Sequence, residues 1–202
     1  MQFSHDSKSP TTLPDTLPVM VLPECHLFPG CLLPLYIFEE RCRLMLAHAL
    51  SEHRMFCIGN RTEQNEISPF STAGLVRCCV KQESGTSHLL LLGLQRIRFT
   101  GWVQETPFRI ATVEAVQTII GDLAHAAKLK ARALELFDLA GIECAEQLRD
   151  MLADCDDAEV VCDVMSYHFT RCPKLQQQLL AEPSLERRYA LLIDALEKHQ
   201  CI

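Results

Sequence analysis

The sequence predicts an α+β fold in which a β-barrel with one inserted helix precedes a helical bundle. Up to residue 121 the apolar residues form short or alternating runs, which are typical of strands. From residue 122 onward they recur every three or four positions, which is typical of helices that bury one face. With 202 residues, 48% of them hydrophobic, the chain is long and apolar enough to fold around a core.

The predicted barrel, residues 17–121, follows a polar stretch over residues 1–16 that predicts a loose N-terminal tail. An apolar stripe through Met45 and Ala49 predicts one helix over about Glu40 to Glu52. Strands are expected at Val19 to Leu22, Leu32 to Phe38, Met55 to Ile58, Gly74 to Lys81, His88 to Phe99 and Ile110 to Gln117.

The predicted helical half covers residues 122–202. Asp122 is a suitable N-cap for its first helix, as are Asp157 and Ser184 for later ones, and Pro173 suits a first helical position. The later helices are expected over about Cys144 to Leu152, Ala158 to Phe169, Pro173 to Ala181 and Leu185 to Lys198.

The chain is acidic, with a formal net charge of −7 and a pI of about 5.6. Residues 1–121 carry 10 Lys and Arg against 11 Asp and Glu (net −1), whereas residues 122–202 carry 9 against 15 (net −6). The chain therefore lacks the overall positive field of a non-specific nucleic-acid binder. The acidic excess of the second half is interpreted as solvated helical faces.

Cysteine usage indicates the cellular compartment, and hydropathy indicates whether a membrane is involved. The eleven cysteines are an odd number and include no CxxC pair, and the N-terminus is polar, which indicates free thiols in a reducing cytoplasm. No apolar run reaches the roughly eighteen residues of a membrane span, so no membrane partner is expected.

The most specific stretch runs from Leu27 to Met45. Its Phe28-Pro29-Gly30 turn places a fixed φ beside a residue that can take a positive φ. Pro34 confines the strand that follows to a sheet edge or a strand start. Upstream the chain has the form LP-x-x-x-LP from Leu17, and downstream it has GLxR from Gly93.

Together these segments resemble the N-terminal substrate-binding domain of Lon proteases, and the chain is identified as a stand-alone member of that family. The match extends over roughly Leu17 to Leu196. Cys42 departs from the tyrosine that the family usually has there. The resemblance implies a six-stranded, PUA-like β pseudo-barrel followed by a helical subdomain, an architecture that also occurs in cereblon and in RING-linked Lon-domain proteins.

The resemblance also implies a function. It implies a non-catalytic module that binds unfolded or tagged polypeptides, as an adaptor or accessory factor for a protease on another chain. The ATPase and serine-lysine peptidase modules of full Lon proteases are not expected, because the sequence contains no GxxxxGK[ST] phosphate loop. No cofactor and no metal are implied.

Four residues are candidates for substrate binding. Phe28 and Tyr36 could line an apolar groove, since aromatic anchors dominate many interfaces, although core packing is the stronger expectation for Phe28. Glu40 and Arg41 open the predicted helix, at a corner that the resemblance places on a face suited to substrate. An acidic residue in a first turn also simply complements the helix dipole.

The alternatives concern other chemistries. A PUA-like RNA-binding module would need a contiguous basic face around Arg96, Arg98 and Arg109, although a structural ion pair, for example with Glu39, is the favoured use of the first two.

Cysteine-based hydrolysis would need a thiol beside His88. The thiols in question are Cys78 and Cys79, and the nearest approach to a metal-ligand set is Cys155, Cys162, His168 and Cys172. Trp102 is a candidate hot spot or core residue. The leucine-rich last helix could instead form a homodimer.

Overall fold

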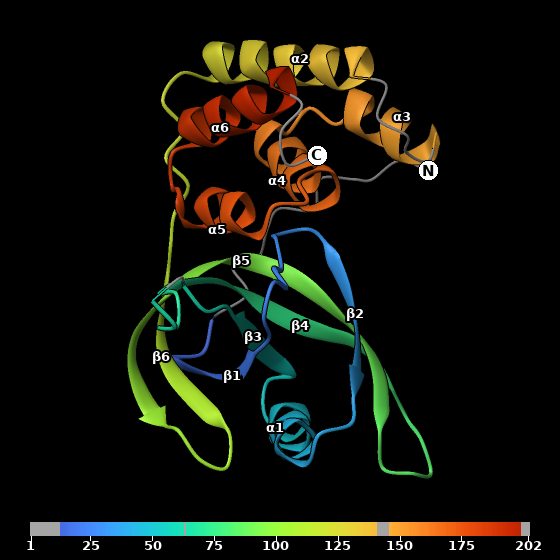
Figure 1. Cartoon of the computed structure of the whole chain (residues 1–202), viewed down its shortest axis with the longest axis vertical. Coiled ribbons are helices and arrows are strands. Elements are labelled where there is room, and N and C mark those ends of the chain that lie inside the picture. Colours follow the sequence, from blue (N-terminus) through green and yellow to red (C-terminus); the bar gives the residue numbers. More distant parts are fainter. Residues whose placement is uncertain (1–12, 63, 141–145, 199–202) are drawn as a thin grey trace.

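A computed structural model describes residues 13–62, 64–140 and 146–198. The strands and the first helix occupy one layer and the later helices another, as Figure 1 shows. The strand-rich layer consists of β1 (Thr16–Val21), β2 (Leu32–Ile37), α1 (Glu40–Ser51), β3 (Met55–Gly59), β4 (Phe70–Lys81), β5 (Ser87–Gln104) and β6 (Arg109–Ala115). The helical layer consists of α2 (Leu123–Leu139), α3 (Glu146–Asp154), α4 (Ala158–Phe169), α5 (Pro173–Ala181) and α6 (Leu185–Glu197).

The six strands form one sheet in the order β2-β5-β4-β3-β1-β6, and β6 also pairs with β5. This second pairing closes five strands into a ring, because the 18-residue β5 bends from β4 toward β6 at two register shifts. β2 lies outside the ring and pairs only with the first half of β5. Pro34 therefore sits on an edge strand, as expected from its missing N–H.

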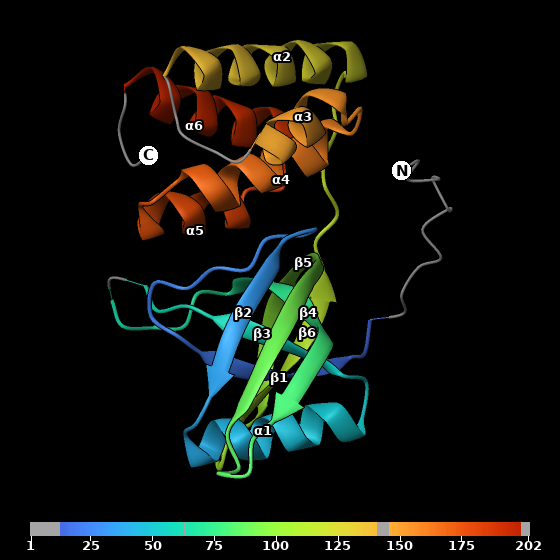
Figure 2. The same ribbon diagram turned by 90° about the vertical axis from the view of Figure 1, so that its right-hand side faces the viewer.

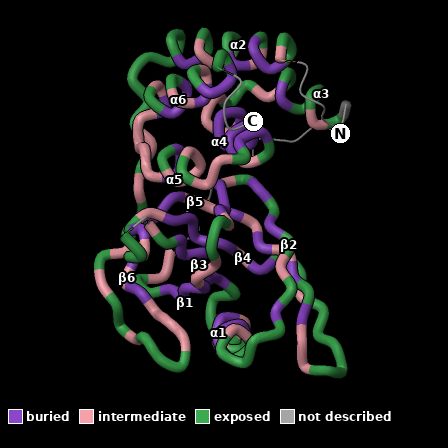
Figure 3. The backbone as a smooth tube through the Cα atoms, in the orientation of Figure 1, coloured by how far each residue is buried: buried purple, intermediate pink, exposed green. Residues whose placement is uncertain are grey.

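Apolar side chains fill the barrel. The helix α1 covers the end that is remote from the helical layer (Figure 2). Met45, Leu46 and Ala49 of α1 are buried, which confirms the predicted stripe. They pack on strand residues that include Phe56 and Leu91, both fully buried. Figure 3 shows in purple the buried residues along the strands and α1.

The bundle has its own core, formed by buried residues of all five helices. Asp157 caps α4 by accepting hydrogen bonds from the backbone N–H groups of Glu159 and Val160, as predicted. The final helix buries Leu185, Leu192 and Leu196 inside this core. The leucines that could have formed a homodimer are therefore used within the chain.

The Phe28-Pro29-Gly30 turn joins the two layers. Phe28 is fully buried and belongs to the core of the bundle rather than to that of the barrel. Gly30 has a φ of +77° and donates its N–H to the carbonyl of Gly93 at 2.9 Å. The carbonyl of Phe28 lies so close to Gly93 that a Cβ there would be 2.1 Å from its oxygen. Two segments that carry the Lon resemblance are thus in direct contact.

A buried ion cluster fixes the bundle on the barrel. Arg96 of β5 contacts both carboxylate oxygens of Asp163 of α4, at 2.7 and 2.6 Å. Arg188 of α6 contacts the same carboxylate at 2.9 Å, and Glu159 lies 3.3 Å from Arg188. Burial alone would lower the pKa of Arg96, but the hydrogen bonds and charge of Asp163 raise it above its ordinary value.

The structure corrects several predicted details. Arg96 does form a structural ion pair, but its partner is Asp163, whereas Glu39 pairs with Arg41 at 2.8 Å. Thr16, expected in the tail, begins β1. The predicted start of the third helix at Cys144 and the first twelve residues of the tail lie outside the described residues.

His26 provides a pH-dependent contact between the layers. It is 5% exposed, and its Nε2 lies 3.2 Å from the Gln177 Oε1 of α5. Because the Gln177 amide nitrogen donates to Ser68, its oxygen is the acceptor and the imidazole is the donor. Burial lowers the pKa of His26, and the glutamine contacts only partly offset this. The folded state therefore favours the neutral imidazole.

We expect the free energy of unfolding to fall as the pH is lowered through about 6.5, the pKa of histidine in an unfolded chain. Below this pH the unfolded chain gains a proton that the folded chain resists at His26. Urea titrations at pH 7.5 and 5.5 measure the effect, and His26→Gln should reduce the difference between them. His168→Gln is measured in the same way for comparison. Burial also lowers the pKa of His168, so this variant shows how much of the pH effect comes from that histidine. An unchanged difference in His26→Gln would refute the assignment.

Candidate functional site

The edge strand β2 presents an apolar surface to solvent. Tyr36 is 51% exposed and Phe38 59% exposed, and their rings stack with centroids 5.7 Å apart. Tyr36 also stacks on His88 of β5 at 4.7 Å, and the exposed Val80 of β4 lies opposite His88 in the sheet. We call Pro34, Tyr36, Phe38, Val80 and His88 the edge patch. The patch places the rings of Tyr36, Phe38 and His88 next to one another at the edge strand.

Backbone polarity makes this edge available to another strand. Gly93 donates its N–H to the carbonyl of Cys31 at 2.9 Å, so odd-numbered residues of β2 direct their backbone groups to β5. Even-numbered residues direct theirs outward. The hydroxyl of Tyr167 in α4 donates to the outward carbonyl of Leu32 at 3.0 Å and so covers one end of the edge. No other described strand pairs with β2, so among the described residues the backbone around Pro34 and Tyr36 remains open.

The structure separates the four predicted substrate residues. Tyr36 lies in the edge patch. Phe28 is fully buried and has no surface to offer a ligand. Glu40 and Arg41 are both exposed but line different depressions, one against the β4–β5 hairpin and the other against β1 and the β5–β6 connection. The four residues therefore do not converge on one site.

Arg41 borders the larger of these depressions, a groove of about 570 Å³. Three arginines from separate segments, Arg41, Arg61 and Arg109, line it together with Glu105. Its apolar lining consists of Val19, Met20, Val21, Pro23, Met45, Pro107 and Phe108, with Cys42 beside them. We call this cavity the arginine groove. Sequence reasoning missed it because the three arginines lie far apart along the chain.

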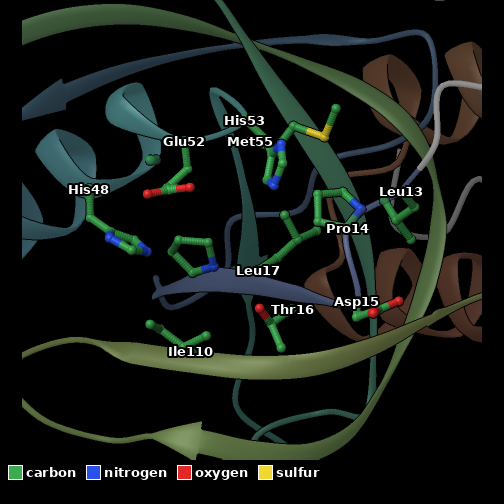
Figure 4. Close-up of a pocket in the computed structure, with 12 residues that line it drawn as sticks. Leu13, Pro14, Asp15, Thr16, Leu17, His48, Glu52, His53, Met55 and Ile110 are labelled. Carbon is green, nitrogen blue, oxygen red and sulfur yellow. The ribbon is translucent and has the colours of Figure 1, made fainter.

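A second cavity of about 520 Å³ lies near the C-terminal end of α1. Figure 4 shows His48, Glu52 and His53 on one side of it and Ile110 on the opposite side, with Leu17 of its wall between them in this view. Within the described ranges, no three His, Cys, Asp or Glu side chains are placed to hold a metal ion, here or elsewhere. The grouping from Cys155 to Cys172 accordingly does not assemble.

The basic face required for RNA binding is not assembled. Arg96 is 3% exposed and held by Asp163, so it contributes nothing to the surface. Arg98 is exposed and pairs with Glu114 at 2.9 Å. Arg109 lies over the ring of Trp102 at 5.3 Å, which places this tryptophan beside the arginine groove rather than in the core.

The cysteine alternative is only partly met by geometry. Cys78 is exposed and lines one surface depression together with His88. No hydrogen bond joins these two described residues, since Cys78 lies opposite Leu90 in the sheet, whereas His88 lies opposite Val80 and stacks on Tyr36. Elsewhere, burial raises the pKa values of Cys31 and Cys162 to about 12, far from those of reactive thiolates.

None of the described helices is long and apolar enough to cross a lipid bilayer.

A family model for the substrate-binding domain of the ATP-dependent protease La (LON) matches residues 16–198. The chain belongs to the LON substrate-binding domain family. The matched residues include all of β1 and all of α6, so both layers of this LON domain belong to the family unit.

Curated relatives of the LON domain are Lon proteases. That of Anaeromyxobacter dehalogenans is 24% identical over 198 residues, which are 92% of this chain and 23% of that protein. Lon protease 2 of Herpetosiphon aurantiacus is 25% identical over 97% of this chain and 26% of its own length. The Lon protease of Koribacter versatilis is 31% identical over 57% and 14%. The chain thus spans about a quarter or less of these proteins.

Two solved structures share the fold. The N-terminal domain of a Mycobacterium avium complex Lon protease superposes with a TM-score of 0.78 and 17% identity, over 91% of this chain and 99% of that one. The Lon N-terminal domain protein of Xanthomonas campestris gives a TM-score of 0.65 and 20% identity, over 89% and 97%. The α+β fold predicted from the sequence is therefore confirmed.

Two buried residues of the ion cluster were missed by sequence reasoning. Arg188 falls three residues after Leu185 and four before Leu192, and a charge on such an apolar face is a signal for a buried partner. Asp163 is 1% exposed within a helix whose neighbouring residues are also buried. Its partners come from β5 and α6, and no local pattern indicates them.

Proposed function

We propose that this LON domain is a non-catalytic module that binds polypeptide segments by strand addition at β2. One observation carries the proposal: a free edge strand that exposes stacked aromatic side chains beside open backbone groups. In strand addition the backbone bonds provide affinity and alternate side chains provide specificity. The family supports the class of ligand, since it is named for substrate binding.

Degradation is the process that the relatives suggest. Lon proteases contain this domain as a small part of their length, and this chain matches that part alone. We infer that it presents unfolded or tagged polypeptides to a protease supplied by another chain, in a reducing cytoplasm that keeps its thiols free. Barrel and bundle, residues 17–121 and 122–202, would then act as binding and supporting domains.

Removing the two stacked rings should weaken peptide binding without unfolding the protein. We expect Tyr36→Ala with Phe38→Ala to bind an aromatic-rich extended peptide about tenfold more weakly or worse, since aromatic anchors dominate such contacts. Both side chains are more than half exposed, so the stability should change by less than about 1 kcal/mol. Fluorescence anisotropy with a labelled peptide measures the affinity, and circular dichroism checks the fold.

Leu123→Ala provides the matched control. Leu123 is 75% exposed and lies on α2, in the other layer. Its truncation removes exposed apolar surface from that other layer and should leave peptide affinity unchanged. Equal losses in the two variants would indicate non-specific apolar adsorption. Failure of the wild-type protein to bind any peptide at physiological salt would refute the proposed function.

A further inference from the structure

We propose that the arginine groove binds the C-terminal residue of a polypeptide, with the carboxylate on the arginines and an apolar side chain on the groove floor. The proposal rests on the polypeptide-binding function above and adds a second site with its own lining residues. None of the residues of the edge patch lines the arginine groove. The two sites can therefore be tested separately.

The charge of the groove favours a carboxylate. Arg41 comes from α1, Arg61 from the connection between β3 and β4, and Arg109 begins β6. Glu105 is the single acidic side chain among the lining residues, and Glu66 adds another in the adjoining depression. Glu39 pairs with Arg41 but does not line the groove, so the guanidinium groups exceed the carboxylates within the lining itself, on a chain whose net charge is −7. Guanidinium groups match carboxylates in geometry and charge.

The three arginines also have donors to spare. Arg41 contacts Glu39 through Nε at 2.8 Å, and Arg61 donates from Nη1 to the Asn65 carbonyl at 2.7 Å. Arg109 contacts Glu105 through Nη1 at 3.2 Å. A guanidinium carries five N–H donors, so these contacts leave most of them for a ligand. Arg41 and Glu39 are exposed and so is Glu105, whereas Arg109 is 30% exposed. Ion pairs that reach solvent are weak enough for a second carboxylate to share or replace.

The floor of the groove selects an apolar side chain. Met20 and Met45 are buried at its base, and methionine adapts to ligands of different shape. Phe108 is held from behind by His48, with ring centroids 5.4 Å apart. These side chains face the same cavity as the arginines, so the groove combines an apolar surface with a cationic rim.

A chain end matches this combination better than an internal acidic residue. A C-terminal residue carries its carboxylate and its side chain on one α-carbon, so a single residue can reach both surfaces. An internal Asp or Glu would need a neighbouring residue for the floor and room for the chain to leave in both directions. A nucleic acid is disfavoured, because Arg109 covers the Trp102 ring on which a base would stack.

Two labelled peptides test the proposal. Both have the same Gly- and Ser-rich sequence ending in Leu, but one ends in a free carboxylate and the other in an amide. The wild-type protein should bind the free acid about tenfold more tightly or better, because a charge-assisted hydrogen bond is lost in the amide. Arg41→Ala and Arg61→Ala should each reduce this preference severalfold. Arg98→Ala, which removes another exposed arginine, should preserve it.

The outcomes separate this proposal from the proposed function. Equal affinity for acid and amide, or an equal effect of Arg98→Ala, would overturn the groove assignment while leaving polypeptide binding in place. The groove assignment would also be overturned if an amidated peptide with an internal Glu bound as tightly as the free acid, or if an RNA oligonucleotide displaced the free acid. If neither these peptides nor the aromatic-rich peptide bound the wild-type protein, both proposals would fall.

Discussion

Replacing Asp163 by Asn should lower the free energy of unfolding by about 3–5 kcal/mol, the range found when one partner of a buried ion pair is removed. The Asp163 carboxylate accepts from Arg96 at 2.7 and 2.6 Å and from Arg188 at 2.9 Å. Both arginine side chains are at most 2% exposed. Without the carboxylate, two guanidinium groups would share a site of low dielectric with only Glu159 to compensate them.

The expected loss follows from leaving charges unpaired rather than from the worth of the intact cluster. Two buried cations cost free energy that their contacts to one carboxylate offset, so the net contribution of the whole cluster is small. Asparagine keeps the size of the side chain and removes the charge. Because the cluster joins β5 to α4 and α6, we also expect the bundle to loosen from the barrel, with faster amide exchange in both helices.

Glu114→Gln is the matched control for this substitution. Glu114 pairs with Arg98 at 2.9 Å, and both side chains are more than half exposed. Exposed pairs contribute about 0–1 kcal/mol, so this variant should unfold close to the wild-type midpoint in urea. A loss in Asp163→Asn no larger than that in Glu114→Gln would show that the cluster is not isolated from water and does not hold the layers together.

The regular elements could be predicted because their signals are local. Helices α4 and α5 have the predicted bounds, since Asp157 provides the cap of the first and Pro173 opens the second. The start of β4 could not be predicted. Ser71 and Thr72 interrupt the apolar pattern, yet both are buried, and the Ser71 hydroxyl donates to the Ile58 carbonyl on β3. That partner is known only once the strands pair.

The functional surfaces were less predictable than the fold. Tyr36, predicted as an aromatic anchor, is 51% exposed on the edge strand β2. Phe28 was expected to pack beside the turn, but nothing local indicated that its neighbours would come from the bundle. The arginine groove combines residues from α1, the β3–β4 connection and β6, so only the closed barrel brings them together. Long-range assembly, rather than composition, creates it.

Gly93→Ala should lower the free energy of unfolding by about 3 kcal/mol or more, which exceeds the usual cost of overpacking because the obstacle is backbone. A Cβ at residue 93 would lie 2.1 Å from the Phe28 carbonyl oxygen and 2.8 Å from its carbon. The turn cannot withdraw without cost, because Gly30 donates to the Gly93 carbonyl and Gly93 donates to Cys31, each at 2.9 Å. Moving Phe28 would also disturb the core of the bundle.

Gly101→Ala, in the same strand, separates this close approach from the general effect of removing a glycine. The nearest atom to a Cβ at residue 101 is the Thr112 hydroxyl at 3.0 Å, a side-chain group that can rotate away. We expect its stability to change by at most about 1 kcal/mol in either direction. Chemical denaturation of both variants provides the comparison. Similar small effects would mean that the Phe28 turn can shift away from β5, and that its contact with Gly93 does not fix the position of β2 and its edge patch.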